Sequence, residues 1–229
     1  MGDTLSHSSL AGVAIGLVFG YNPILTSFIF TSAAGLVIEF LRNYYKKYAE
    51  LILVIVLTFS VGIAIVLIST GKANANVNSF LFGSILTVSK GELRAVFLMS
   101  IISVLTLLLL YNQLLYITFD EEGAKICGIK VKLINYLFAL LVGATISISI
   151  RILGILVISS MIAMPVAASL QLHKGFKLTF IFSIIFGFID IMAGLVLSYY
   201  INSAPGGTIA LVSVLTLVIT LAYRKLFRK

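Results

Sequence analysis

The chain has 229 residues, of which 60% are hydrophobic and only 10% are charged, and its formal net charge is +8. A soluble domain carries roughly 25% charged residues, so this chain has too few of them to cover a water-facing surface. The composition therefore excludes a water-soluble globular protein and predicts an integral protein surrounded by membrane lipid.

Eight apolar segments follow one another along the chain, at residues 5–21, 23–41, 49–69, 94–117, 133–150, 152–170, 177–200 and 206–223. A helix needs about 20 residues to cross a hydrocarbon core of ~30 Å. The pattern predicts an all-α transmembrane bundle with about eight spans, in which residues 1–229 form a single domain. The first and sixth segments are short for a full crossing, which favours tilted, broken or protein-buried helices there.

The basic residues are distributed unequally between the connections. If the crossings alternate, twelve of the sixteen lysines and arginines fall on one side, and the four on the other side are Lys72, Lys90, Arg94 and Arg151. The positive-inside rule then places residues 120–132, the turn at 171–177 and the carboxy terminus in the cytoplasm, and the loop 71–92 outside. Because this rule explains the net charge, no nucleic-acid partner is expected.

The longest polar interruption is the stretch TFDEEGAKICGIKVKL at residues 118–133. Acidic residues followed by small residues and a later glycine can form a short helix with a sharp end, since glycine tolerates a positive φ. One interpretation is a solvated loop, and the other is a docking helix that receives a push from a cytoplasmic motor. The residues in question are Phe119, Asp120, Glu121, Glu122, Gly123, Ala124 and Gly128.

Near the amino terminus, Asp3 and His7 are four residues apart and would share one face of a helix. A carboxylate and an imidazole at this spacing can both ligate a divalent transition metal ion. The alternative is structural: Asp3 caps the helix and His7 hydrogen-bonds within the bundle.

Other polar residues inside apolar segments need an explanation. Glu39 lies near the cytoplasmic end of its segment, where it can reach Arg42. Asp190 lies in the middle of a segment without a basic partner, which predicts a place in a bundle interior or along a water-filled path. Pro165 and Pro205 each predict the start or a break of a helix.

Sequence patterns typical of catalysis are missing. The sequence contains no phosphate-binding loop and no HExxH zinc-protease pattern, so ATP hydrolysis by this chain is not expected. The single cysteine, Cys127, excludes an intrachain disulfide.

Three stretches of the sequence resemble the membrane permeases of bacterial ABC transporters for manganese, zinc or iron. The start, MGDTLSHSSLAGVA, is similar to the family signature GDALSHAVLPGVA, and residues 79–89 contain the family's LFGSILTVS. Residues 119–128, FDEEGAKICG, match the cytoplasmic pattern FDEE-x-A-x-x-x-G. The resemblance covers essentially the whole chain.

The resemblance implies a homodimer with a type II ABC importer-like fold in the bacterial cell membrane. Two copies of a separate cytoplasmic ATP-binding cassette ATPase would drive it, and an extracytoplasmic metal-binding protein would supply the ion. Asp3 and His7 would meet the transported manganese, zinc or iron, with no permanently bound cofactor, and residues 119–128 would contact the ATPase.

The sequence also departs from the family pattern. Ser9 and Ala11 replace an apolar residue and a proline of the signature. Family members carry at least one span before this motif, so the resemblance predicts that an upstream span is missing. The alternatives are a permease for an iron chelate or cobalamin, and a truncated membrane protein that does not transport.

Overall fold

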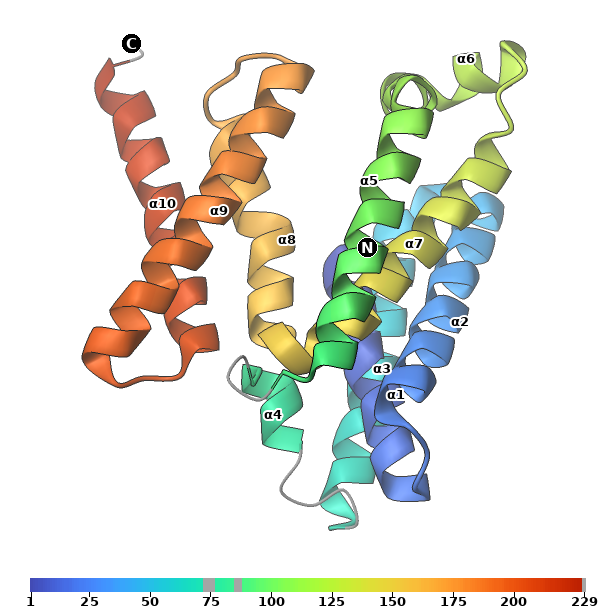
Figure 1. The fold of residues 1–229 in the computed structure, drawn as a ribbon. Helices are drawn as coiled ribbons and strands as arrows, with labels where there is room; N and C mark the ends of the chain where they lie inside the picture. The colour runs from blue at the N-terminus through green and yellow to red at the C-terminus, as the bar shows by residue number, and fades with distance from the viewer. Residues whose placement is uncertain (72–76, 85–87, 228–229) are drawn as a thin grey trace. The chain divides into compact units, whose positions relative to one another are not determined.

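The computed structural model describes residues 1–71, 77–84 and 88–227, and the described residues are almost entirely helical (Figure 1). The elements are α1 (Gly2–Phe19), α2 (Pro23–Tyr44), the 3₁₀ helix η1 (Lys46–Tyr48), α3 (Ala49–Ser69), α4 (Val77–Phe82), α5 (Lys90–Phe119), α6 (Glu121–Ile126), α7 (Val131–Leu153), α8 (Ile155–Leu170), α9 (Phe176–Ile201) and α10 (Pro205–Phe227). The predicted all-α class is confirmed.

Each of the eight predicted apolar segments is a helix. Six of the helices in the described part of the chain are long and apolar enough to cross a membrane, and they are α2, α3, α5, α7, α9 and α10. The other two are α1 and α8, which correspond to the two segments predicted to be short. With 16 residues, α8 is below the usual spanning length.

Several helix ends are specified locally by the sequence. Asn22 accepts hydrogen bonds from the backbone of Ile24 and Leu25, and Pro23 follows it at the first helical position of α2. Ser89 and Glu92 form a reciprocal capping box, so α5 starts at Lys90, four residues before the predicted apolar segment. Pro205 opens α10 as predicted.

The prediction for Pro165 is wrong, because this residue lies inside α8. A membrane helix tolerates an internal proline where neighbouring groups satisfy the backbone carbonyl that it frees.

The chain divides into two compact units, which are described separately below. Unit 1 consists of residues 3–74 and 86–149, and unit 2 consists essentially of residues 75–85 and 150–229. Whether they act as the single predicted domain, 1–229, stays a prediction.

In unit 1, α1 is the buried helix. Its Ser8 shares a hydrogen bond of 2.8 Å with Ser60 of α3, and its Ser9 shares one of 2.7 Å with Ser27 of α2. A Cβ on Gly12 would lie only 2.5 Å from the Cα of Ser27. The small residues of α1 therefore permit backbone contact with α2 and hydroxyl pairing on both flanks.

In unit 2, α8, α9 and α10 pack against one another. A Cβ on Gly194 of α9 would meet the Cα of Ile209 of α10 at 2.6 Å, and Ile209 is fully buried. Arg224 near the end of α10 donates a hydrogen bond of 2.8 Å to Gln171 at the end of α8. The 171–177 turn and the end of α10 therefore lie at the same end of this unit, as the alternating topology requires.

Candidate functional site

The predicted metal pair lies in the first two turns of α1. The Nε2 atom of His7 is 3.8 Å from Oδ1 of Asp3, and the two side chains are 34% and 53% exposed, respectively. They lie on the same face of the helix, as their spacing predicts. Because α1 begins at Gly2, Asp3 lies within its first turn, and the cap position falls on Met1.

The residues between and after this pair are buried and fix the helix that carries it. Leu5 is fully buried, and Ser6 donates a hydrogen bond of 2.7 Å to the backbone oxygen of Asp3. The helix that carries the pair is thus held by hydrogen bonds to α2 and α3, while the side chains of Asp3 and His7 remain partly accessible.

A carboxylate and an imidazole supply two ligand groups, which is fewer than the four that a structural zinc site uses. Within the described ranges, no group of three or more His, Cys, Asp or Glu residues could hold a metal ion. Partial coordination suits an ion that passes through better than one that stays, because the remaining ligands can exchange.

The second predicted element, the polar stretch at 119–128, contains α6 (Glu121–Ile126). Asp120 caps it by accepting a hydrogen bond of 2.8 Å from the backbone N–H of Gly123. Gly128 ends the stretch with φ of 80°, the left-handed conformation predicted for it. Ala124 is fully buried, whereas Phe119 is 72% exposed and Ile126 is 87% exposed. The helix therefore rests on one small residue and presents Ile126 outward, and Phe119, the last residue of α5, is exposed just before it.

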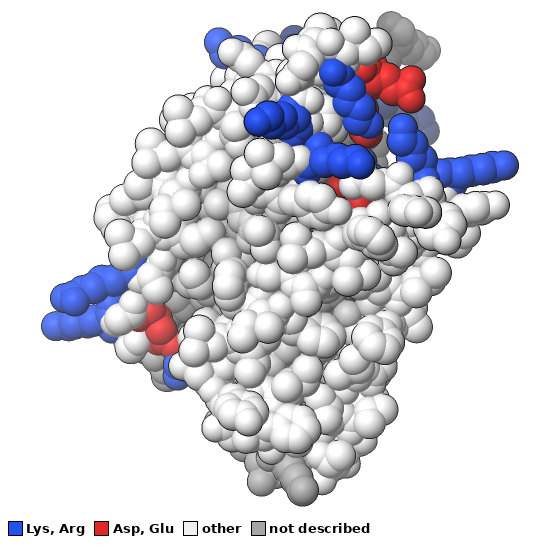
Figure 2. All heavy atoms as spheres, turned by 90° about the vertical axis from the view of Figure 1, so that its right-hand side faces the viewer, with Lys and Arg blue, Asp and Glu red and all other residues white. Residues whose placement is uncertain are grey.

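Opposite charges surround α6. Lys125 donates a hydrogen bond of 2.5 Å to Glu121, and this contact lowers the pKa of the Glu121 carboxyl, with smaller contributions from the charges of Lys125, Lys46 and Arg42. Lys46 lies 3.6 Å from Glu122. Figure 2 shows basic and acidic atoms gathered toward the top of the view and a smaller group at its left edge, with a wide uncharged surface between and below them.

Asp190 of α9 is fully buried, as predicted for a carboxylate in a bundle interior. Thr216 of α10 donates a hydrogen bond of 2.5 Å to its Oδ1 atom. Among the described residues, the Oδ2 atom has no hydrogen-bond partner. One carboxylate oxygen thus remains available in the interior of unit 2.

Sequence reasoning missed how deeply Glu39 is buried. Its side chain is 3% exposed and lies 3.3 Å from Arg42, so the predicted partner is confirmed. The serine pairs of α1 were also missed. Nothing in the sequence tells which hydroxyl meets which.

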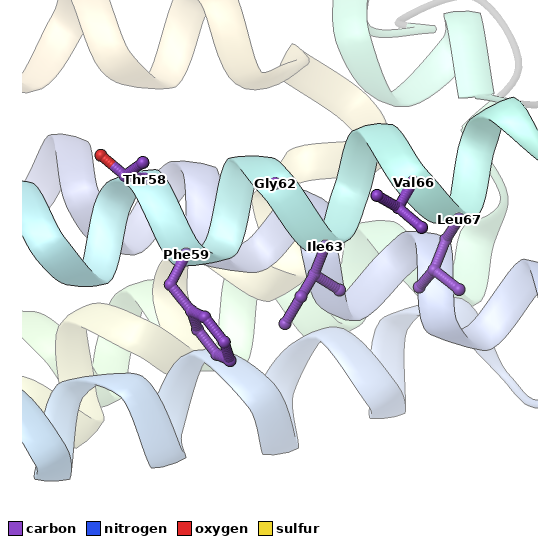
Figure 3. A pocket seen from close by; sticks show the side chains of 6 residues that line it. All are labelled: Thr58, Phe59, Gly62, Ile63, Val66 and Leu67. Carbon is purple, nitrogen blue, oxygen red and sulfur yellow. The ribbon is translucent and has the colours of Figure 1, made fainter.

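An apolar hollow of about 390 Å³ lies along α3, lined by Thr58, Phe59, Gly62, Ile63, Val66 and Leu67. Figure 3 shows the side chains of Phe59, Ile63 and Leu67 on the same side of this helix. The hydroxyl of Thr58 is engaged with the backbone oxygen of Val54 at 2.9 Å. The hollow offers no ligand group for an ion, and its chemistry suits lipid chains.

Known proteins place these elements in a family. The model of the ABC 3 transport family matches residues 1–224. A "Probable metal transport system membrane protein" of Treponema pallidum is 50% identical over 228 residues, which cover 100% of this chain and 86% of the relative. The "High-affinity zinc uptake system membrane protein ZnuB" of Haemophilus influenzae is 26% identical and covers 98% of this chain and 86% of its own length.

Further relatives are named as manganese and iron transport system membrane proteins. Among solved structures, "PsaBC from Streptococcus pneumoniae in complex with Fab" aligns with a TM-score of 0.81 and 26% identity, covering 99% of this chain and 84% of that one. Together with the apolar helices, these matches identify the chain as a multi-pass membrane permease of metal transport systems, and it belongs to the ABC 3 transport family.

Proposed function

We propose that this permease passes divalent metal ions into the cytoplasm and that Asp3 and His7 meet the ion on its way. The observation that carries the proposal is the carboxylate–imidazole pair on α1, 3.8 Å apart and partly exposed on a helix of which more than half the residues are buried. In a family of metal transport systems, an ion is the simplest ligand for such a pair.

The ion is manganese, zinc or iron, and the two ligand groups do not select among them. Imidazole suits zinc and iron, whereas carboxylate and water suit manganese. The relatives bear names for all three metals.

The driving force comes from a separate ATP-binding cassette ATPase in the cytoplasm, which docks on residues 119–128. Exposed apolar side chains next to a charged helix are typical of a surface that a partner covers. Phe119 and Ile126 provide this surface here, and Asp120, Gly123, Ala124 and Gly128 keep the helix in shape. Two permease copies would form the pathway, and an extracytoplasmic metal-binding protein would load it from the other face.

Closure of the ATPase dimer would move α6 and open the pathway alternately to the two sides. Asp190 is a second station for the ion or for a proton, because its unpaired oxygen lies in a bundle interior. Buried carboxylates in membrane helices commonly mark such pathways.

Metal accumulation in cells tests the proposal. Cells without other uptake systems would express the permease with its ATPase and binding protein, and their manganese, zinc and iron contents would be measured. Loss of a directly contacting ligand is expected to lower uptake at least about tenfold, so Asp3→Ala and His7→Ala should both do so. The control is His173→Asn, which changes the other of the two histidines.

Normal uptake in both Asp3→Ala and His7→Ala would remove the site assignment. Uptake of an iron chelate or cobalamin instead of bare ions would favour the related permease class. If the assembled wild-type complex accumulates none of these, the proposed transport function is wrong.

A further inference from the structure

A polar cavity separates α6 from the end of α2 in unit 1. Its volume is about 180 Å³, and its lining comes from α2, η1, α3, α6 and α7 through Glu39, Arg42, Asn43, Lys46, Ala49, Glu121 and Asn135. All but one of these residues carry a charge or an amide. At this cavity, therefore, α6 faces α2 across polar and charged side chains.

Two ion pairs lie at this cavity, one between η1 and α6 and one within α2. The Nζ atom of Lys46, in the connection after α2, lies 3.6 Å from Oε1 of Glu122 on α6. Arg42 lies 3.3 Å from Glu39 on its own helix, and its charge also helps to lower the pKa of Glu121. Lys46 of the α2–α3 connection and Arg42 near the end of α2 thus face the carboxylates of α6.

Glu39 is the fixed part of this arrangement. Its carboxylate is nearly inaccessible, and its backbone oxygen accepts a hydrogen bond of 2.7 Å from the Asn43 side chain. A buried carboxylate requires a partner, so Arg42 is held at the cavity wall. Lys46 and Glu122, by contrast, are 60% and 82% exposed. The arrangement has a buried anchor and an exposed contact that can form and break.

The same face of α2 leads to the metal pair. Gly35 lies one turn before Glu39, about 6 Å along the helix axis. A Cβ on Gly35 would be 3.6 Å from Cδ2 of Leu5, which lies in α1 between Asp3 and His7. Farther along, Ser9 and Ser27 join the two helices directly. A displacement at the end of α2 therefore reaches α1 through the Gly35–Leu5 contact and the Ser9–Ser27 hydrogen bond.

We infer that the Lys46–Glu122 contact, anchored by Glu39 and Arg42, transmits the movement of α6 to α2 and through it to the Asp3–His7 pair. The inference rests on the proposed function and adds positioning residues to it. Packed elements with two arrangements can carry such coupling between separate sites. Without the contact, α6 still docks on the ATPase, but its movement is no longer passed on to α2.

The test measures metal uptake per ATP hydrolysed in proteoliposomes that contain the permease and its ATPase. Residues in one charged network are coupled, so Lys46→Glu and Glu122→Lys should each lower this ratio by at least about threefold, and the double exchange should restore it to within about twofold of wild type. The control is Lys47→Glu, an exposed neighbour, which should leave the ratio unchanged. A loss of stability alone would lower uptake and coupled hydrolysis together and would not be rescued by exchange.

A double exchange that is as poor as the two single variants combined would overturn the inference. Wild-type proteoliposomes that hydrolyse ATP without uptake would instead overturn the proposed function, so the two failures are distinguishable.

Crosslinking gives a second measurement, in which a covalent tether takes the place of the ion pair. In a Cys127→Ser background, Lys46→Cys and Glu122→Cys remove both charges, so uptake per ATP should fall before any crosslinker is added. A flexible bis-maleimide that joins the two cysteines should then raise the ratio toward wild type, because the tether lets α6 and the end of α2 move together. If the tether lowers uptake further, while the same reagent has no effect on either single-cysteine variant, the two elements slide past each other and the inference is wrong.

Discussion

The helices α1 and α5 contrast in how they are buried. More than half of the residues in α1 are buried, whereas none of the thirty residues of α5, all of them described, is buried. Yet α5 is among the clear membrane spans and α1 is not. Hydropathy thus identifies the helix that presents apolar side chains outward, while the candidate metal pair lies on the helix whose backbone and hydroxyl groups make the close contacts.

The largest expected effect comes from filling the contact between α1 and α2. Gly12→Leu would place side-chain atoms where the backbone of Ser27 lies, which should cost about 3 kcal/mol or more of stability. Thermal unfolding in detergent would measure it. Gly62→Leu on α3 is the matched control, because a Cβ at that position would have open space around it. Equal losses for the two variants would contradict the contrast between a tightly packed α1 and open helix surfaces.

Truncating one leucine in α1 and one in α5 compares the stability cost of the same substitution at a buried and at an exposed position. Leu5→Ala on α1 removes a fully buried side chain and should cost roughly 2–5 kcal/mol. Leu109→Ala on α5 removes one that is 81% exposed and should change the unfolding free energy little. A large cost at Leu109 in the assembled transporter, absent in the isolated chain, would show that a second copy or another subunit covers α5.

The hydroxyl groups of α1 should also contribute more to stability than those of α5. Ser9→Ala leaves the buried Ser27 without its partner and should cost about 1 kcal/mol, since interhelical hydrogen bonds in membranes are individually modest. Ser100→Ala on α5 removes only a bond to the backbone of its own helix and should be nearly neutral. A double-mutant cycle with Ser27→Ala measures the pair, and a coupling energy near zero would contradict the role assigned to it.

The smallest expected effect is the loss of α6 stability at low pH. Because the Lys125 hydrogen bond lowers the pKa of Glu121, the pair stabilises α6 above the ordinary glutamate pKa, and this contribution is lost as the pH falls through the lowered value. Both side chains are about one-third exposed, so the loss should be below about 1 kcal/mol. Amide exchange of α6 should speed up in wild type as the pH falls below the ordinary glutamate pKa. In Glu121→Gln, this increase, once corrected for the intrinsic dependence of exchange on pH, should be smaller.

The sequence predicted elements that depend on local chemistry. Long apolar segments predicted the eight helices, and an acidic start followed by a glycine predicted α6 with Gly128 after its end. The sequence alone could not predict features that depend on residues far apart in the chain. The burial of Glu39, the partner of Ser9 and the Thr216 contact of Asp190 each require knowing which helices are neighbours.

The hydrophobic pattern also failed to predict some local details. The capping box at Ser89 extends α5 beyond its apolar residues, and Pro165 is accommodated inside α8. The loop at 71–92 contains α4, but its residues 72–76 and 85–87 lie outside the described ranges, as do Arg228 and Lys229 of the basic carboxy terminus. The external position predicted for this loop, the roles of Asp3, His7 and Asp190, and the docking role of residues 119–128 stay predictions.

The tight connection between α1 and α2 has a consequence for biogenesis. Gly20 turns the chain at φ of 75°, and Gly16 lies so close to Pro23 that a Cβ would be 2.8 Å from its Cα. A helix with several hydroxyls, a carboxylate and an imidazole partitions poorly into lipid by itself. We therefore expect the translocon to release α1 and α2 as one hairpin, with Ser9 of α1 already paired with Ser27 of α2 during insertion.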